Sequence, residues 1–272
     1  MGIFSIIMNL KCIQLFLLFV CSFFSQSNGL TDKEENHRES VKFGVYYSLQ
    51  TLLDDLEKEK YQSNKNIKAL LHTFDSHCRP RENARPLRKK RMFPFIVLEG
   101  NQRTSRRILS RMLSRSLGAK LVEHTPRCVI HLRHFFEENI DLKRMFFSLA
   151  TYLTAFNVRH ILEETPVVLS GYWMDQAAFN IAKEFAVELP PHDSILYQFP
   201  PDLLIPDLVI YLNSCSYRFP VSDEVKEQNL RVNEIYRRFR NPTVVEINST
   251  IVTEKTIIDI RRIIKSKLAT KY

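Results

Sequence analysis

The segment from Glu99 to Arg107 joins an apolar run to a basic, helix-patterned stretch, and phosphate-binding loops occupy such junctions. In the working pattern G-x-x-x-x-G-K-[ST], glycines let backbone amides curl around phosphate, the lysine reaches the outer phosphates, and the hydroxyl holds Mg²⁺. Gly100 matches the first glycine, but Ser105 and Arg106 stand at the second glycine and the lysine, and Arg107 replaces the hydroxyl. On this pattern alone the segment is no match, and its position after an apolar run is what makes it a candidate for a degenerate nucleotide-binding loop. Its residues are Gly100, Thr104, Ser105, Arg106 and Arg107.

The two arginines of this loop allow two interpretations. Arg106 and Arg107 would open a helix whose first amides point at the same spot, and a guanidinium is a good bidentate partner for phosphate. On this interpretation anion binding survives the loss of the motif. On the other, both arginines face solvent, because a segment with a single glycine is not forced to form a cradle.

Four residues with metal-binding side chains follow in a short stretch. They are His124, Cys128, His131 and His134. Their spacing fits no standard zinc-ligand pattern, so we predict no metal site. No nucleophile and base can be paired from the sequence either, so no catalytic residue is assigned.

The elements that must position the loop can be predicted from residue 92 onward, where apolar runs alternate with helical patterns. The predicted strands are 95–98, 120–122, 167–169, 207–212 and 244–247. The predicted helices are 104–117, 142–163, 175–187, 223–239 and 253–268. Continuous apolar strands alternating with helices indicate a five-stranded parallel sheet covered on both faces, with ligands beyond the carboxyl ends of the strands.

The N-terminus has the layout of a secretory signal. No acidic residue occurs before Asp32, and Lys11 precedes an apolar run over 12–24 and a polar stretch with small residues over 25–29. The apolar run is short for a membrane span, and a mitochondrial presequence would be rich in arginine. We therefore predict a signal peptide at 1–29, secretion or residence in the ER lumen, and no membrane span after signal removal. The mitochondrion is the alternative.

Between this signal and the alternating region lie two further segments. Residues 30–78 form a helical extension, with helical spacing over 40–56 and 67–74. Residues 79–91 form a basic linker with two prolines, in which the run 88–91 resembles a processing-protease site but fits a solvated linker better.

Two kinds of residue bear on the compartment. Asn248 begins an N-x-[ST] triplet after an apolar run, so we predict that it is glycosylated. Cys78, Cys128 and Cys215 remain after the signal, and this odd number is no disulfide framework and leaves at least one thiol free or paired between chains.

A resemblance to a known family runs from about Phe93 to the C-terminus. It is carried by Phe93–Gly100, Phe146–Leu149, Gly171–Trp173, Leu189–Pro191, Tyr197–Leu204 and Pro206–Leu208. In joint order and spacing these segments resemble the thymidylate kinase family, particularly its mitochondrial UMP–CMP kinase branch. The resemblance implies that 92–272 is an α/β domain of the P-loop nucleotide-kinase type, with three layers and a five-stranded parallel sheet. It also implies substrate-pocket candidates, which are Arg133, Phe147, Tyr172 and Trp173; core packing is their alternative, and the better one for Phe147.

The sequence differs from that family at the positions where charged residues are expected to act on phosphate, Mg²⁺ and substrate. An acidic residue of the loop is replaced by Gln102, and the Asp-Arg pair expected before Tyr-Trp is Ser170-Gly171. The arginine-rich lid expected after the fourth strand is not evident. Arg218 is isolated, and Arg231, Arg237 and Arg238 fit a solvated helix face better. Electrostatic groups of this kind supply most of the rate in phosphoryl transfer.

The sequence therefore predicts a secreted pseudokinase that acts by binding. The net charge of +9 favours an anionic partner, such as a nucleotide, and a protein partner is the other possibility; no specific nucleic-acid recognition is expected. No cofactor is expected, and ATP and Mg²⁺ would be needed only if activity is retained. One alternative is an active UMP, CMP or dTMP kinase with rearranged phosphate and Mg²⁺ ligands, for which the mitochondrion is the alternative location. Another is a basic docking module in which residues 30–92 do the binding.

Overall fold

The centre of the fold is β1 (Phe95–Gly100), whose residues are all buried. In a computed structural model of the chain, the described residues are 41, 43–78, 93–213, 221–248 and 254–268. β1 pairs in parallel with β3 (Val167–Ser170) on one side and with β4 (Leu208–Asn213) on the other. β2 (Lys120–Val122) and β5 (Val244–Asn248) complete the sheet in the order β2-β3-β1-β4-β5. The predicted five-stranded parallel sheet is confirmed.

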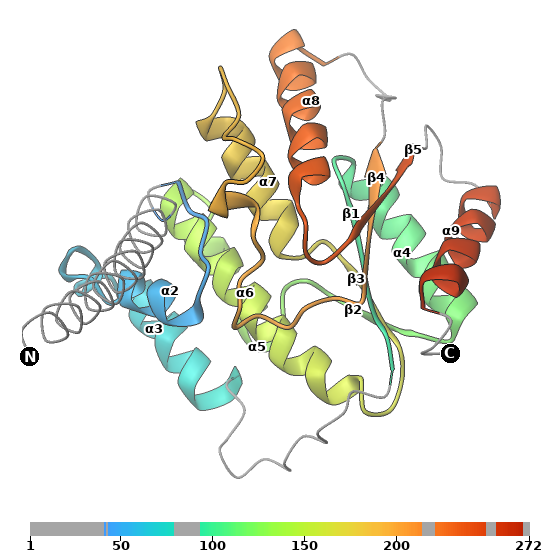
Figure 1. Ribbon diagram of the computed structural model, residues 1–272. Coiled ribbons are helices and arrows are strands. Elements are labelled where there is room, and N and C mark those ends of the chain that lie inside the picture. The colour runs from blue at the N-terminus through green and yellow to red at the C-terminus, as the bar shows by residue number, and fades with distance from the viewer. Residues whose placement is uncertain (1–40, 42, 79–92, 214–220, 249–253, 269–272) are drawn as a thin grey trace, which may run out of the picture. The chain divides into compact units, whose positions relative to one another are not determined.

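Helices cover both faces of this sheet, as its continuous apolar strands require (Figure 1). On one face lie α4 (Arg103–Leu117) and α9 (Glu254–Lys267), which share an apolar core with β1, β3 and β4. On the other face lie α6 (Ile140–Ile161) and α7 (Trp173–Glu184), with α8 (Asp223–Arg238) packed against α7. The three-layer α/β fold predicted from the sequence is therefore confirmed, and none of the helices in the described part of the chain is long and apolar enough to cross a bilayer.

The N-terminal extension contributes α2 (Leu49–Leu56) and α3 (Lys65–Thr73), followed by a π-helical turn to Cys78. The helix predicted from residue 40 begins only at Leu49, and that prediction was wrong for 43–48. Gly44 has a φ of 77°, which interrupts a helix, and Ser48 caps the helix that follows by accepting from the Thr51 N–H at 3.1 Å.

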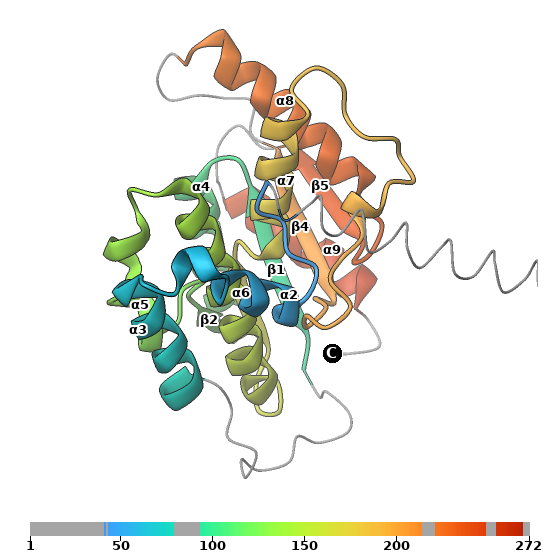
Figure 2. The same cartoon turned by 90° about the vertical axis from the view of Figure 1, so that its left-hand side faces the viewer.

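Residues 43–47 pack into the same compact unit as the sheet. The Trp173 indole N–H donates to the carbonyl of Tyr46 at 2.9 Å, and the Asn180 amide donates to the carbonyl of Gly44 at 3.1 Å. α2 lies beside α6 in both views (Figures 1 and 2). The described part of the extension is thus integral to this unit, while the domain boundaries at 29, 78 and 91 stay predictions.

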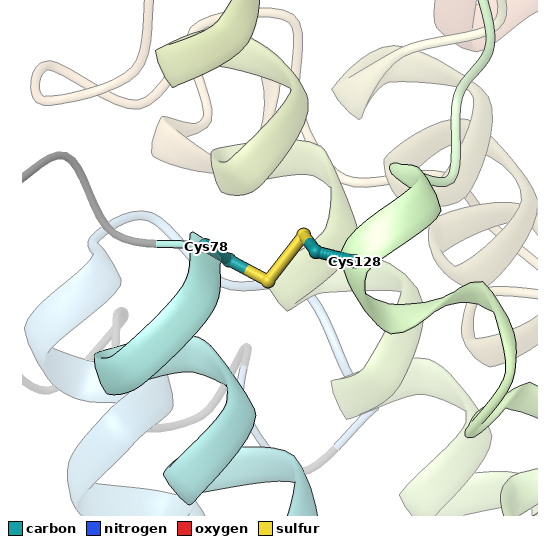
Figure 3. The surroundings of a disulfide bond; sticks show 2 residues. All are labelled: Cys78 and Cys128. Carbon is teal, nitrogen blue, oxygen red and sulfur yellow. A yellow bond between two sulfur atoms is a disulfide. The ribbon is translucent and has the colours of Figure 1, made fainter.

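A disulfide joins Cys78, at the end of the extension, to Cys128 on α5 (Arg127–Ile130), with their Cα atoms 6.0 Å apart (Figure 3). The sequence did not predict this pair, which spans 50 residues. Cys215 lies outside the described residues. The linker 79–91 also lies outside the described residues. Within them, the disulfide is a covalent link between the end of the extension and α5.

Candidate functional site

Most of the predicted phosphate-binding loop belongs to the first turns of helix α4 (Arg103–Leu117). β1 ends at Gly100, and α4 already begins at Arg103, with Gln102 as its N-cap. The Arg106 N–H donates to the Gln102 carbonyl at 3.0 Å, so it is an ordinary helical amide. In the working motif, the residues before the lysine curl around phosphate. Here residues 103–105 form the first turn of α4, and only Asn101 and Gln102 lie between that helix and β1, so no extended cradle of amides remains.

Arg106, at the position of the phosphate-gripping lysine, is buried at 6% exposure. Its Nη1 donates to the Gly100 carbonyl at 2.8 Å and to Asp175 Oδ1 at 2.7 Å, and its Nη2 donates to Asp175 Oδ2 at 3.0 Å. Glu99 Oε2 lies 4.0 Å from Nη1. Burial acts to lower the pKa of Arg106, but the charges of Asp175 and Glu99 outweigh it and raise that pKa. The cation is therefore neutralised from within the protein.

Gly171 makes room for this ion pair. It has a φ of 79°, and a Cβ there would lie 2.9 Å from Arg106 Nη2 and 3.3 Å from Asp175 Oδ2. The arginine expected at position 171 from the family resemblance would therefore collide with the pair. Ser170, where the family's aspartate is expected, has a buried hydroxyl with no hydrogen-bond partner among the described residues. The changes at 106 and 171 are thus parts of one rearranged centre.

Glu99 completes the centre as a fully buried carboxyl group. Its Oε1 accepts from the Tyr172 N–H at 3.0 Å, and its Oε2 has no hydrogen-bond partner in the described structure. Burial and then the charge of Asp175 raise the pKa of Glu99 to about 8, against the opposing effects of Arg106 and the backbone N–H groups of Tyr172 and Asp175. Asp175 is committed to Arg106, and Glu99 favours its neutral form, so neither carboxyl is a ready Mg²⁺ ligand.

Two cavities open around this centre. The first, of about 400 Å³, lies at the start of α4 and is bounded by Gly100, Arg106, Asp175 and Tyr236 among others. The second, of about 570 Å³, lies between α4, α6 and α7, and we call it the basic cavity. Its lining combines four cations with apolar and amide side chains. The cations are Arg103, Lys143, Arg144 and Lys183, the apolar residues are Ile140, Phe147 and Phe179, and the amides are Gln176 and Asn180; Asp175 completes the lining.

The cations of the basic cavity are poorly neutralised. Arg144 has an ion pair with Asp141 at 3.6 Å. Within the described ranges, Arg103, Lys143 and Lys183 form no ion pair. The cavity can therefore accept an anion, and its aromatic walls can accept a flat apolar group.

The predicted pocket residues are separated by the fold. Phe147 lines the basic cavity, and the Arg133 guanidinium lies over its ring at 5.4 Å while pairing with Glu137. Tyr172 and Trp173 are buried and line neither cavity; the Tyr172 hydroxyl donates to the Leu204 carbonyl at 3.1 Å. Their contacts are those of core packing, which the sequence left open as the alternative.

The remaining loop residues point elsewhere. Thr104 and Arg107 are exposed on α4, so of the two arginines only Arg107 faces solvent. The interpretation in which both arginines face solvent was wrong for Arg106, which is buried and has a carboxylate partner at Asp175 that sequence spacing did not reveal. The sequence feature that could have indicated this contact is Gly171, because the lack of a side chain there leaves space for a larger neighbouring side chain.

The arginines of α8 are engaged within the protein. Arg237 pairs with Glu246 at 2.9 Å, and the Arg231 Nε donates to the Ala182 carbonyl at 3.1 Å. Arg238 pairs with Glu234 and has a side chain only 14% exposed, so its assignment to a solvated helix face was wrong. Arg218 lies outside the described residues.

The His and Cys group has other contacts. Cys128 is bonded to Cys78, and His124 contacts the Thr151 hydroxyl through Nε2 at 3.2 Å. Burial lowers the pKa of His124 to about 4. Within the described residues, no group of three or more His, Cys, Asp or Glu side chains could hold a metal ion.

Comparison with known proteins finds relatives among curated sequences and similar folds among solved structures. No protein-family model matches the chain. Human mitochondrial UMP-CMP kinase 2 is 27% identical over 165 residues, which are 59% of this chain and 35% of that protein, so the match spans about a third of the relative's length. Thymidylate kinase from Candida albicans superposes with a TM-score of 0.50 at 16% identity, covering 64% of this chain and 92% of that one. Deoxyadenosine kinase from M. mycoides with bound dATP gives a TM-score of 0.46 at 11% identity, covering 62% and 98%.

Proposed function

From the relationship of this chain, in sequence and fold, to thymidylate-kinase-like nucleoside monophosphate kinases, we propose that it is a pseudokinase that acts by binding. The observation that carries the proposal is the buried Arg106–Asp175 pair at the position of the phosphate grip. Phosphoryl transfer depends on cations that neutralise the migrating group, and each such charge is worth orders of magnitude in rate. Here the cation is held by a carboxylate of its own chain, and the first turn of α4 replaces the amide cradle.

The test is a phosphoryl-transfer assay on the purified chain without its predicted signal. Labelled ATP and Mg²⁺ are supplied with CMP, UMP, dUMP or dTMP, and human UMP-CMP kinase 2 serves as the positive control. We expect transfer no faster than in the enzyme-free control. Transfer that requires Mg²⁺ would refute the proposal and favour the alternative, an active kinase with rearranged ligands.

For the binding role we propose that the basic cavity accepts a nucleoside monophosphate or a similar anion with a flat apolar part. Its cations, Lys143 and Lys183 among them, match a phosphate, and Phe147 and Phe179 match a base. Titration calorimetry with CMP and dTMP, with and without Mg²⁺, tests this. We expect Mg²⁺-independent binding that weakens in the variant K143Q/K183Q and persists in K65Q, in which Lys65 is an exposed residue of α3. Equal affinity of both variants for the ligand would contradict the assignment.

We further propose that the protein works in the secretory pathway or outside the cell. Structural disulfides persist in oxidising compartments, and Cys78–Cys128 is one such bond. Asn248 is exposed at the end of β5, where a glycan has access; the two residues that complete its triplet lie outside the described residues. A C-terminally tagged chain should appear in the medium with a glycosidase-sensitive mass that N248Q lacks. Recovery in mitochondria without a glycan would contradict this proposal.

A further inference from the structure

Helix α4 carries a row of arginines on its outer side, of which only Arg103 also lines the two cavities. We call Arg103, Arg107, Arg111 and Arg115 the arginine stripe. All four are exposed, whereas Leu109 and Leu113 on the inner side are fully buried. A spacing of four residues puts successive members on one face, about 6 Å apart, so the stripe runs for about 18 Å along the helix. α4 lies on the outside of the sheet next to α9 (Figure 1).

The charge of the stripe is not neutralised by the described parts of the protein. Helix α4 contains no Asp or Glu, and none of the four arginines forms an ion pair within those ranges. By contrast, Arg106 on the inner side and Arg237 on α8 each have a carboxylate partner. The outer face of α4 is therefore a line of guanidinium groups directed to solvent.

Such a line is unfavourable for an isolated helix. Like charges four residues apart destabilise a helix, and Arg103 adds a cation at the N-terminal end, where the helix dipole is positive. Alternating acidic and basic residues would give equal solubility without this repulsion. An extended anionic partner lying along the helix would remove it, because each guanidinium can bind an oxyanion in a bidentate manner.

We propose that the arginine stripe binds a linear sulfated polysaccharide. A row of regularly spaced cations is complementary to a polymer with regularly spaced anionic groups. α4 contains no aromatic residue on which unpaired bases could stack, and this disfavours single-stranded nucleic acid. The Cys78–Cys128 disulfide indicates an oxidising compartment, where sulfated glycans are found and nucleic acids are not the usual polyanion. The choice of a glycan thus rests on the proposed secretory location, whereas the affinity for polyanions does not.

The experiment measures binding of the purified, oxidised chain to size-defined heparin fragments by calorimetry over a series of salt concentrations. The variant R107Q/R111Q/R115Q leaves both cavities untouched. The control K65Q/K68Q/R127Q removes the same net charge from exposed positions on α3 and α5. By analogy with phosphate contacts, the slope of log K against log salt should fall by about one for each stripe arginine removed. The control should keep the slope and the affinity of the natural sequence within about twofold.

Three outcomes would overturn the proposal: no binding to heparin fragments, equal loss in the stripe and control variants, or tighter binding to double-stranded DNA or RNA of equal length than to heparin fragments. The first two would remove the stripe as a binding surface, and the third would reassign it to a nucleic acid. None of them bears on phosphoryl transfer, which is measured separately. Circular dichroism must show that both variants are folded like the natural chain. The variant R107K/R111K/R115K supplies a second test, because it keeps the charge and should weaken binding less than the glutamine variant does.

Discussion

Replacing Asp175 by Asn should leave the buried Arg106 cation without its counter-charge and so lower the free energy of unfolding. The Asp175 carboxylate accepts two hydrogen bonds from Arg106, whose side chain is 7% exposed, while the Asp175 side chain is 40% exposed. Removing one partner from a fully buried ion pair costs about 3–5 kcal/mol. Water reaches the Asp175 side of this pair and Glu99 lies 4.0 Å away, so we expect a smaller loss, about 2 kcal/mol.

The assay is equilibrium unfolding of the natural chain and of D175N, by denaturant and by heat. A loss of about 2 kcal/mol should lower the melting temperature by roughly 4–8 °C in a domain of this size. D223N serves as a matched control, because Asp223 forms an exposed pair with Lys226 on α8, and its loss should change little.

A double variant tests the Arg106–Asp175 pair in a second way. In R106M/D175L both members of the pair become apolar, so no charge is stranded, and the double variant should be more stable than the sum of the single changes predicts. If D175N is as stable as the natural chain, or if the double-mutant cycle shows no coupling, then the Arg106–Asp175 pair does not hold the centre together.

Three more predictions follow from the same centre and from the disulfide. G171A should lower the free energy of unfolding by about 1–3 kcal/mol, because the backbone there is left-handed and the new Cβ would lie 2.9 Å from Arg106 Nη2. G118A, where φ is 62° and the Cβ would meet open space, should lower it by less in the same unfolding assay. Because the folded pKa of Glu99 is raised from 4.5 to about 8, its contribution to stability is present below pH 4.5 and lost as the pH rises towards 8. E99Q should therefore flatten the stability profile over that window, and an unchanged profile would show that Glu99 is ionised in the folded state. Finally, C78S/C128S should lose about 4 kcal/mol by chain entropy for a closure of 50 residues, measured against the oxidised chain, and the reduced natural chain should match the variant.

The parallel sheet and its covering helices could be predicted from the sequence because their patterns are local. Val167–Leu169, for example, is an apolar run of strand length, and α9 carries apolar residues at helical spacing. The carboxyl ends of parallel strands lie at one edge of the sheet, so the sequence could predict that the residues after β1 lie at that edge. The same local signals misplaced the start of α2, because Gly44 and the Ser48 cap outweigh the helical spacing before Leu49.

The chemistry of the centre could not be predicted in the same way. Arg106 and Asp175 are 69 residues apart, and nothing in their local sequence joins them. Asp175 is an acidic residue in the first turn of α7, which is a common and stabilising place for a carboxylate and indicates no buried partner. The disulfide was hidden for the same reason, because three cysteines allow several pairings and only the packing of the extension brings Cys78 to Cys128.

The docking of residues 43–47 has an optical consequence. Trp173 is the single tryptophan of the chain, is 6% exposed, and contacts this segment through its indole N–H and the ring of Tyr47. It also lies two residues from Gly171 and next to Tyr172, which donates to Glu99. Its fluorescence therefore reports from one known place, between the N-terminal segment and the rearranged centre. A red shift on release of the segment, or a change in intensity when a ligand enters, can be assigned without labelling the protein.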